Sequence, residues 1–355
     1  MIATDPSASD TGGRPAGRRF RKIATEEAFS IREIAALFHE ITKTTSSSIE
    51  MPVLKINYAD MEGERLQKLF DIGEGRLAEM DRNDVDMHLL SLTSPGVQMF
   101  RPDIANAFAA LANDRLAEAI VRHPTRFAGL AAFAPQDPQA AVKEMERAVT
   151  TLRLNGFIVN SHTNNEYLDH EKFWPILEAA EALDRPIYIH PRGPSDGMAA
   201  PFRLGDGGLA NGNIENAAWG YAVETGTHAI RMILSGVFDR FPKLKIVLGH
   251  MGENIPFALW RLDFMGGPPR NKRIELMPSE YFRRNFAITT SGVEHHPTLR
   301  YAIEVVGEDN VMWAIDYPYQ PTTPAVASMD SAPIPDAVKE KVYHGNAERL
   351  FHIAA

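Results

Sequence analysis

Eight short apolar runs recur along the 355-residue chain, and stretches of helical pattern lie between them. The runs cover residues 22–29, 86–93, 126–133, 156–163, 186–191, 245–250, 286–292 and 311–318. Strands that alternate with helices form parallel βαβ units, because a parallel strand pair needs a long crossover connection. Eight such units predict an α/β fold, the (β/α)8 or TIM-like barrel, with the active site at the carboxyl ends of the strands.

The length fits one such barrel, which takes ~250 residues before insertions. We expect residues 21–355 to form a single metal-dependent catalytic domain and residues 1–20, which are small and polar, to form a flexible tail. A long insertion is expected after the first strand, over residues 30–85, and a Gly- and Pro-rich loop after the fifth, over residues 191–213. Long loops in compact domains often cover a functional site.

Composition excludes several classes of function. Cysteine is absent, so the chain has no disulfide, no thiolate ligand and no cysteine nucleophile. The net charge of -9 argues against a nucleic-acid surface, which is normally basic. Residues 1–20 lack the apolar segment of a secretion signal, and no run reaches the ~18 apolar residues of a membrane span. We therefore expect a cytoplasmic protein.

Three residues that can bind a metal stand at the ends of predicted strands. Glu26 ends the first strand, His190 the fifth and Asp316 the eighth. The strand ends of a closed barrel converge, and two carboxylates neutralise a divalent ion in a shell that suits manganese better than zinc. We expect one divalent ion, with Mn²⁺ favoured and Zn²⁺ the alternative. Taken singly, each residue is better explained as a buried polar group that is satisfied by hydrogen bonds, and only the three together favour a metal.

Several segments resemble one known family. The strings ATEEAF (24–29), SHT (161–163), IYIHP (187–191), GHMGE (249–253) and DYP (316–318) resemble the amidohydrolase superfamily. The likeness spans roughly residues 20–352 and is to its branch of non-oxidative decarboxylases, which includes the aminocarboxymuconate semialdehyde and γ-resorcylate decarboxylases. The Glu26-x-Ala28 form, with LTSPGVQ, APQDP and DYPYQ, is similar to the 5-carboxyvanillate decarboxylases within that branch.

The resemblance implies roles for particular residues. It makes Glu26, His190 and Asp316 the metal ligands, and it places Arg65, His228 and His250 in the substrate pocket. It also implies a homodimer or homotetramer in which Arg261 reaches the substrate of a neighbouring subunit.

Two of these residues have simpler interpretations. Arg65 lies in a charged helical segment that solvent can cover, and His228 has the spacing of a helix core position. His162 matches a motif position, but we assign it no catalytic role. Thr93, which follows the second strand, is a further candidate for the lining of the pocket.

Decarboxylation of a hydroxybenzoate needs a proton at the ring carbon that loses CO2. Asp316 is the expected acid, since a carboxyl group in a dry pocket beside negative charge has a raised pKa. His250 and His228 are the other catalytic candidates, with His250 able to relay or stabilise the proton. Arg65 can donate two parallel hydrogen bonds to a substrate carboxylate.

Three functions compete for this sequence. The first is metal-dependent, non-oxidative decarboxylation of an ortho-hydroxylated aromatic acid. The favoured substrate is 5-carboxyvanillate, in the catabolism of lignin-derived aromatic compounds. The alternative substrate is γ-resorcylate or another hydroxybenzoate. The second is a metal-dependent hydrolase of a lactone or amide, in which Asp316 activates a bound water. The third is a metal-stabilised binding protein. Binuclear hydrolases of the superfamily use a modified lysine on the fourth strand, and residues 156–163 contain no lysine.

Overall fold

Eight parallel strands follow one another around a barrel in the order β1 to β8. The computed structural model describes residues 20–44, 48–203 and 214–354. The strands are β1 (Ile23–Phe29), β2 (Met87–Leu92), β3 (Phe127–Ala132), β4 (Gly156–Asn160), β5 (Ile187–His190), β6 (Ile246–Leu248), β7 (Phe286–Thr289) and β8 (Val311–Met312). The predicted TIM-like barrel is confirmed, and each strand lies within the run expected for it.

The chain just after β8 closes the barrel against β1. The backbone N–H of Thr25 donates to the carbonyl of Trp313 (3.1 Å), and that of Ala28 donates to Tyr317 (2.8 Å). In the opposite direction, the N–H of Asp316 donates to the carbonyl of Glu26 (3.1 Å). Strand β8 has only two residues, so these bonds from the segment that follows it complete the ring.

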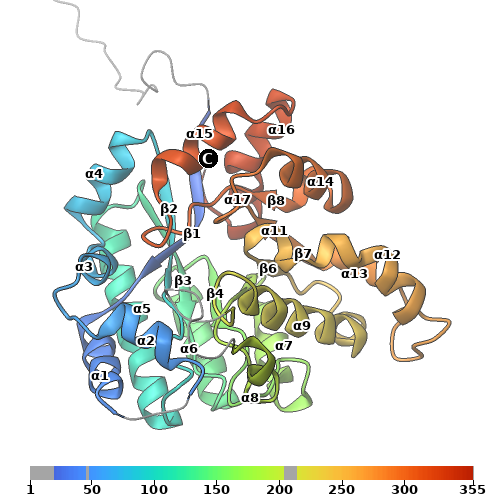
Figure 1. Cartoon of the computed structure of the whole chain (residues 1–355), viewed down its shortest axis with the longest axis horizontal. Helices are drawn as coiled ribbons and strands as arrows, with labels where there is room; N and C mark the ends of the chain where they lie inside the picture. The colour runs from blue at the N-terminus through green and yellow to red at the C-terminus, as the bar shows by residue number, and fades with distance from the viewer. Residues whose placement is uncertain (1–19, 45–47, 204–213, 355) are drawn as a thin grey trace, which may run out of the picture.

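Helices surround the strands, as Figure 1 shows. Those of the outer ring are α5 (Pro102–Arg122), α6 (Pro138–Thr150), α7 (Trp174–Ala182), α9 (Gly220–Leu234), α13 (Pro278–Asn285), α14 (His296–Val306) and α17 (Asn346–Phe351). Helix α5 packs so closely on β3 that a Cβ at Gly129 would lie 2.6 Å from Leu116. Glycine at this position therefore allows the helix to approach the strand.

Further helices and turns lie between these elements and after β8. They are α10 (Val237–Arg240), α11 (His250–Glu253), α12 (Ile255–Gly266), α15 (Thr322–Ser331), α16 (Asp336–Glu340), the 3₁₀ turns η1 (Glu171–Phe173), η2 (Ala200–Phe202) and η3 (Glu308–Asn310), and the π-helical turn η4 (Lys341–Gly345). In the part of the chain that the structure describes, no helix combines the length and apolar character needed to cross a membrane.

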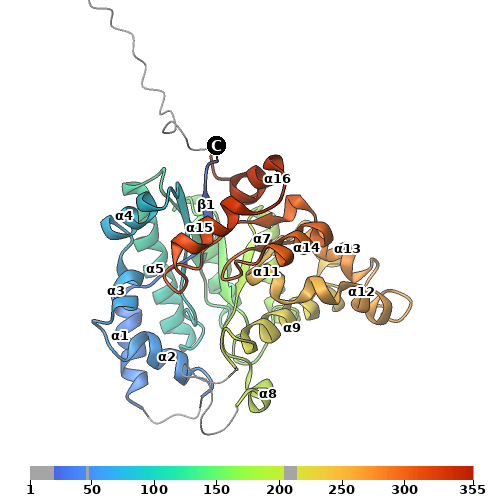
Figure 2. The same cartoon turned by 45° about the horizontal axis from the view of Figure 1, so that its top comes forward.

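Four helices lie between β1 and β2, where the sequence predicted a long insertion. They are α1 (Arg32–Thr42), α2 (Met51–Tyr58), α3 (Glu64–Phe70) and α4 (Glu74–Arg82). Figures 1 and 2 both show them gathered along one side of the barrel. After β5 the chain forms α8 (Asp196–Ala199) and η2. The rest of the predicted loop there, residues 204–213, lies outside the described residues, as do residues 1–19 of the predicted tail.

Candidate active site

Glu26, His190 and Asp316 lie together at the carboxyl ends of the strands. Each offers one ligand atom, and the three atoms lie within 4.8 Å of one another. Glu26 comes from the middle of β1 and His190 is the last residue of β5, while Asp316 follows β8 by four residues. The structure therefore brings together the three residues expected to bind the metal, but the prediction that Glu26 ends the first strand is wrong, because β1 continues to Phe29.

The two carboxylate oxygens of Glu26 have different environments. Oε2 accepts hydrogen bonds from the hydroxyls of Tyr188, Ser291 and Thr289, the last at 2.8 Å. Oε1 is buried and has no hydrogen-bond partner among the described residues. Burial raises the pKa of this carboxyl, but nearby His250 and His190 and the hydroxyl donors outweigh it and lower the pKa overall. One oxygen of an anionic carboxylate is thus held in place while the other remains available to a cation.

His190 presents its Nε2 to the same space. Its Nδ1 lies 2.8 Å from the carbonyl oxygen of Pro191, so Nδ1 carries the proton and donates it. Nε2 is then the atom with a free lone pair, and it lies 3.6 Å from Oε1 of Glu26. Burial lowers the pKa of the ring, which favours the neutral, metal-binding form.

Asp316 has an unusual backbone and an unusual charge environment. Its φ angle is +76°, in the left-handed region that L-residues with a side chain rarely adopt. Burial and the neighbouring Glu26 carboxylate raise its pKa well above the ordinary value. Two anionic carboxylates at this distance repel each other unless a cation or a proton lies between them, so this donor set fits a divalent ion.

His250 lies beside the three ligands within a left-handed turn. All five residues from His250 to Asn254 have φ between +49° and +80°. The turn places Nδ1 of His250 2.8 Å from Oε1 of the buried Glu253, while Nε2 lies 3.6 Å from Oε1 of Glu26. Burial alone would lower the pKa of His250, but the two carboxylates outweigh it and raise the pKa to about 10. His250 is therefore a cation at neutral pH.

A cavity of about 230 Å³ opens onto this cluster. Its volume is below the ~300–1,000 Å³ of typical ligand pockets, which favours a small, single-ring ligand. Besides His190, His250 and Asp316, its lining includes Val53 and Asn57 of α2, Arg65 of α3, Tyr221 and Tyr319. The guanidinium of Arg65 lies 5.7 Å from the centre of the Tyr319 ring. The insertion between β1 and β2 thus supplies one wall of the cavity, including its arginine.

Three predicted site residues lie outside this cavity. The His228 side chain has no exposed surface, and its Nε2 accepts a hydrogen bond from the backbone N–H of Leu168 (3.0 Å). Thr93 is also buried and contacts the cavity only through Tyr319, whose hydroxyl lies 2.6 Å from its Oγ1. Arg261 is exposed on α12. Within one chain, none of the three reaches the metal-binding cluster.

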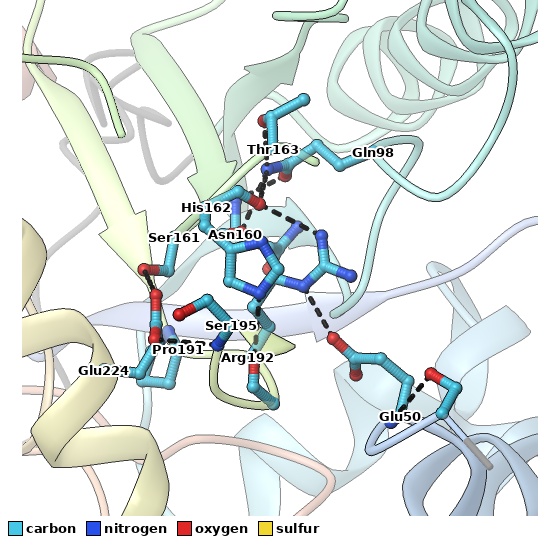
Figure 3. A network of polar contacts seen from close by, with 12 residues as sticks. Glu50, Gln98, Asn160, Ser161, His162, Thr163, Pro191, Arg192, Ser195 and Glu224 are labelled. Atoms are coloured by element: carbon cyan, nitrogen blue, oxygen red, sulfur yellow. Dashed lines mark hydrogen bonds and ion pairs between the residues drawn. The ribbon is translucent and has the colours of Figure 1, made fainter. Parts of the chain in front are cut away.

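Figure 3 shows a buried polar network that the sequence did not predict. Nε of Arg192 donates to Oε1 of Glu50 (2.6 Å), and both side chains are almost fully buried. The Nη1 of Arg192 donates to the carbonyl of His162 (3.1 Å), which also accepts from Gln98. His162 is therefore a structural member of this network. The ion pair fastens the insertion to the segment that follows His190.

The metal cluster generates the first prediction. Purified protein should bind about one divalent ion per chain, and Glu26→Ala, His190→Ala or Asp316→Ala should lose most of it, because two protein ligands hold a labile ion poorly. Elemental analysis of desalted protein measures this. Glu144→Ala, which removes a carboxylate that pairs with Arg147 on α6, is the matched control and should retain the ion. Full occupancy in all three ligand variants would exclude this site.

His228 generates a prediction about pH and stability. Burial, followed by the charges of His162 and Arg231, lowers its folded pKa from 6.5 to about 3. The unfolded chain therefore binds the proton more readily, and the free energy of unfolding falls as pH drops below 6.5. This one group lowers the free energy of unfolding by about 2 kcal/mol at pH 5 relative to pH 8.

Urea unfolding of wild type and His228→Gln at pH 8 and pH 5 measures this cost. His228→Gln should lose less stability than wild type between the two pH values, whereas His295→Gln, at an exposed position, should behave as wild type. Equal losses in wild type and His228→Gln would mean that His228 is not held neutral in the folded protein.

Comparisons with known proteins agree with this site. A family model described as Amidohydrolase matches residues 59–353. The gamma-resorcylate decarboxylase of Polaromonas sp. is 36% identical over 301 residues, covering 81% of this chain and 89% of that protein. The solved 5-carboxyvanillate decarboxylase of Sphingomonas paucimobilis has 52% identity and a TM-score of 0.89, and the match covers 95% of this chain and 100% of that one.

A second solved structure contains a metal. The 5-carboxyvanillate decarboxylase of Novosphingobium aromaticivorans, in complex with manganese and 4-hydroxy-3-methoxy-5-nitrobenzoic acid, has 39% identity and a TM-score of 0.87 over 94% of this chain and 96% of that one. The predicted resemblance is confirmed. The chain belongs to the amidohydrolase family and, within it, to the carboxy-lyases that decarboxylate aromatic acids.

Proposed function

We propose that this enzyme converts 5-carboxyvanillate to vanillate and CO2, with one Mn²⁺ bound by Glu26, His190 and Asp316. The observation that carries the proposal is the three-ligand cluster at the base of a small cavity that also contains an arginine. The 52% identity to a 5-carboxyvanillate decarboxylase favours this substrate over γ-resorcylate. Residues 21–355 act as one catalytic domain, and the reaction belongs to the catabolism of lignin-derived aromatic acids.

The ion supplies electrostatic stabilisation for the phenolate and carboxylate oxygens of the substrate. Arg65 of α3 faces the same cavity and binds a carboxylate of the substrate through paired hydrogen bonds. Tyr319 forms the neighbouring wall, and the 2.6 Å contact with Thr93 fixes its hydroxyl. Thr93 thus contributes to substrate binding by orienting Tyr319, and Val53 and Ile56 of α2 contact the apolar face of the ring.

Asp316 delivers the proton. As the bond between the ring and the carboxylate breaks, the electron pair stays on the ring carbon, and the carboxyl proton of Asp316 is transferred to that carbon. This step needs Asp316 to carry a proton when the substrate is bound, although a bound ion favours its anionic form. His250, which Glu253 holds as a cation, stands beside Asp316 and can return a proton to it. His228 contributes by holding the wall behind the cavity, through Leu168 and Ser161.

Helix α12 is the proposed contact surface with a second copy of the chain. Its exposed side includes Phe257, Trp260, Phe264 and Met265, which are 65%, 73%, 49% and 50% exposed. Figures 1 and 2 show α12 at the edge of the molecule, away from the barrel. Exposed aromatic clusters of this kind are typical of protein interfaces. Arg261 lies on the same helix, and we propose that it reaches the cavity of the partner.

The reaction itself can be tested by isotope labelling. Turnover of 5-carboxyvanillate in heavy water should give vanillate with one deuterium at the carbon that carried the lost carboxylate, because the acid delivers a solvent-derived proton. Mass spectrometry and proton NMR locate the label. Asp316→Asn should abolish turnover, and Arg65→Ala should lower kcat/KM by an amount that corresponds to ~1.5–3 kcal/mol, the value of one charged hydrogen bond.

The matched control for Arg65 is Arg122→Ala. Arg122 is exposed at the end of α5, on the side of the barrel away from the cavity, and its replacement should leave kcat/KM unchanged. Failure to release CO2 from any ortho-hydroxybenzoate by metal-loaded enzyme, together with hydrolysis of a lactone, would replace decarboxylation by the hydrolase alternative.

The role of Arg261 can be tested with hybrid oligomers. Arg261→Ala and Asp316→Asn chains should each be inactive, whereas a mixture should recover about a quarter of wild-type activity, because half of randomly formed dimers carry one intact site. The control mixture is Arg65→Ala with Asp316→Asn. Arg65 and Asp316 line the same cavity of one chain, so this mixture should show no more activity than its Arg65→Ala chains have on their own. If the first mixture also stays inactive although subunit exchange is shown with differently tagged chains, Arg261 acts within its own chain or not at all.

A further inference from the structure

Glu27 is a second buried carboxylate beside the metal ligand Glu26, and the mechanism above does not use it. Its side chain has no exposed surface. Strand β1 shifts register against β2 between Ala24 and Glu27, so that one extra residue is accommodated there. The carboxylate of Glu26 contacts hydroxyls of β5, β7 and Ser291, whereas that of Glu27 contacts the backbone after β8, so the two carboxylates have different surroundings. Within the described residues Glu27 is not part of the metal-binding group.

Glu27 binds the backbone on both sides of Asp316. Its Oε1 accepts a hydrogen bond from the N–H of Ile315, and its Oε2 accepts one from the N–H of Tyr317, both at 2.9 Å. One carboxylate thus spans the two peptide groups that flank the residue with φ of +76°. Left-handed backbone is unfavourable at a residue with a side chain, so it persists only where surrounding contacts impose it.

Further contacts hold the same turn. The N–H of Asp316 donates to the carbonyl of Glu26 (3.1 Å), and the Asp316 carbonyl accepts from the N–H groups of Tyr319 (2.8 Å) and Gln320 (2.9 Å). The backbone N–H and carbonyl of Asp316 are therefore both hydrogen-bonded, which leaves its side chain to face the metal-binding cluster. Glu27 is the side chain that supplies acceptors to the residues before and after it.

Arg76 of α4 provides the positive charge near Glu27. It has no exposed surface, donates from Nη2 to the carbonyl of Ala28 (2.6 Å) and lies 4.9 Å from the centre of the Tyr317 ring. Arg76 also donates to the carbonyls of Asp71 and Lys68, at the end of the helix that carries Arg65. The turn at Asp316 and the helix with the substrate arginine are thereby fixed to one buried guanidinium.

We propose that Glu27 is a positioning residue for Asp316: its carboxylate holds the peptides at 315 and 317 so that the left-handed turn directs the Asp316 side chain to the metal and the substrate. The statement that Asp316 is directed to the substrate rests on the proposed function. The statement that it is directed to the metal rests only on the cluster of Glu26, His190 and Asp316.

Two conservative substitutions test the proposal in different ways. Glu27→Gln preserves size, but its amide nitrogen is a donor that faces a backbone donor, so one of the two hydrogen bonds is lost. Glu27→Asp preserves the carboxyl group and its two acceptor oxygens, but the shorter side chain cannot span both N–H groups at 2.9 Å. Both variants should release one side of the turn without opening a large cavity.

The matched control is Asn113→Ala. The side chain of Asn113 is also buried and also holds backbone, accepting from the N–H and donating to the carbonyl of Ala132 in β3 (2.8 and 2.9 Å). No metal ligand lies at that position. A purely structural role for Glu27 predicts the same behaviour as Asn113→Ala, which is a lower Tm with unchanged kcat.

The experiment measures Tm, kcat, KM and the electron paramagnetic resonance spectrum of bound Mn²⁺ for wild type and each variant. If Glu27 positions Asp316, Glu27→Gln and Glu27→Asp should lower kcat by about 100-fold, the cost of a misplacement of about 1 Å. They should also change the Mn²⁺ spectrum, while Asn113→Ala changes neither.

Wild-type kcat and a wild-type Mn²⁺ spectrum in a folded Glu27 variant would overturn the proposal, and Glu27→Asp serves if Glu27→Gln does not fold. The spectrum also separates this proposal from the proposed function. If wild type binds Mn²⁺ but releases no CO2 from any hydroxybenzoate, the reaction is wrong, yet an altered spectrum in the Glu27 variants still supports the positioning role.

Discussion

The hydrogen bonds that join β1 to the segment after β8 are the constraint on which the site depends. They close the barrel, and in doing so they bring Glu26 and Asp316, which are 290 residues apart in the chain, to the same metal-binding cluster. The bond from the N–H of Asp316 to the carbonyl of Glu26 links the two ligands directly. Because β8 itself is only two residues long, the residues that close the barrel are also the residues that build the site. Stability and chemistry therefore depend on the same few peptide groups.

Electrostatics within the cluster then give each group a separate task. The charges of His250 and His190, followed by the hydrogen bonds from Ser291 and Tyr188, outweigh burial and lower the pKa of Glu26, so it stays an anion. The same negative charge, added to burial, raises the pKa of Asp316, while Glu253 and Glu26 keep His250 positively charged. Active sites typically contain pairs of titratable groups whose surroundings shift their pKa values in opposite directions, so that one acts as an acid and the other as a base. Glu26 as an anion and His250 as a cation thus lie beside Asp316, the proposed proton donor.

The parts of the site that the sequence predicted are those fixed by strand order and residue type. Glu26, His190 and Asp316 could be identified because the carboxyl halves of the strands of a closed barrel converge on one site. The hydroxyls around Glu26 were missed because serine, threonine and tyrosine are ordinary strand residues, and only the closed barrel shows that three of them face one carboxylate. The pair Glu50 and Arg192 was missed because it depends on how the insertion folds across the barrel. His228 was expected in the pocket, but its helix turns it toward Leu168 instead. A sequence motif fixes the residue, whereas side-chain direction depends on packing.

The insertion between β1 and β2 has a consequence for how such an enzyme can change. The metal ligands belong to the barrel, whereas Val53 and Ile56 in the cavity wall belong to α2, which the buried pair of Glu50 and Arg192 anchors as a unit. Replacement of Val53 or Ile56 by a larger or smaller apolar side chain alters the space around the ring without touching any group that binds metal or moves a proton. Single substitutions in α2 can therefore change which substituted rings fit the cavity. The residues that bind metal and move the proton stay the same.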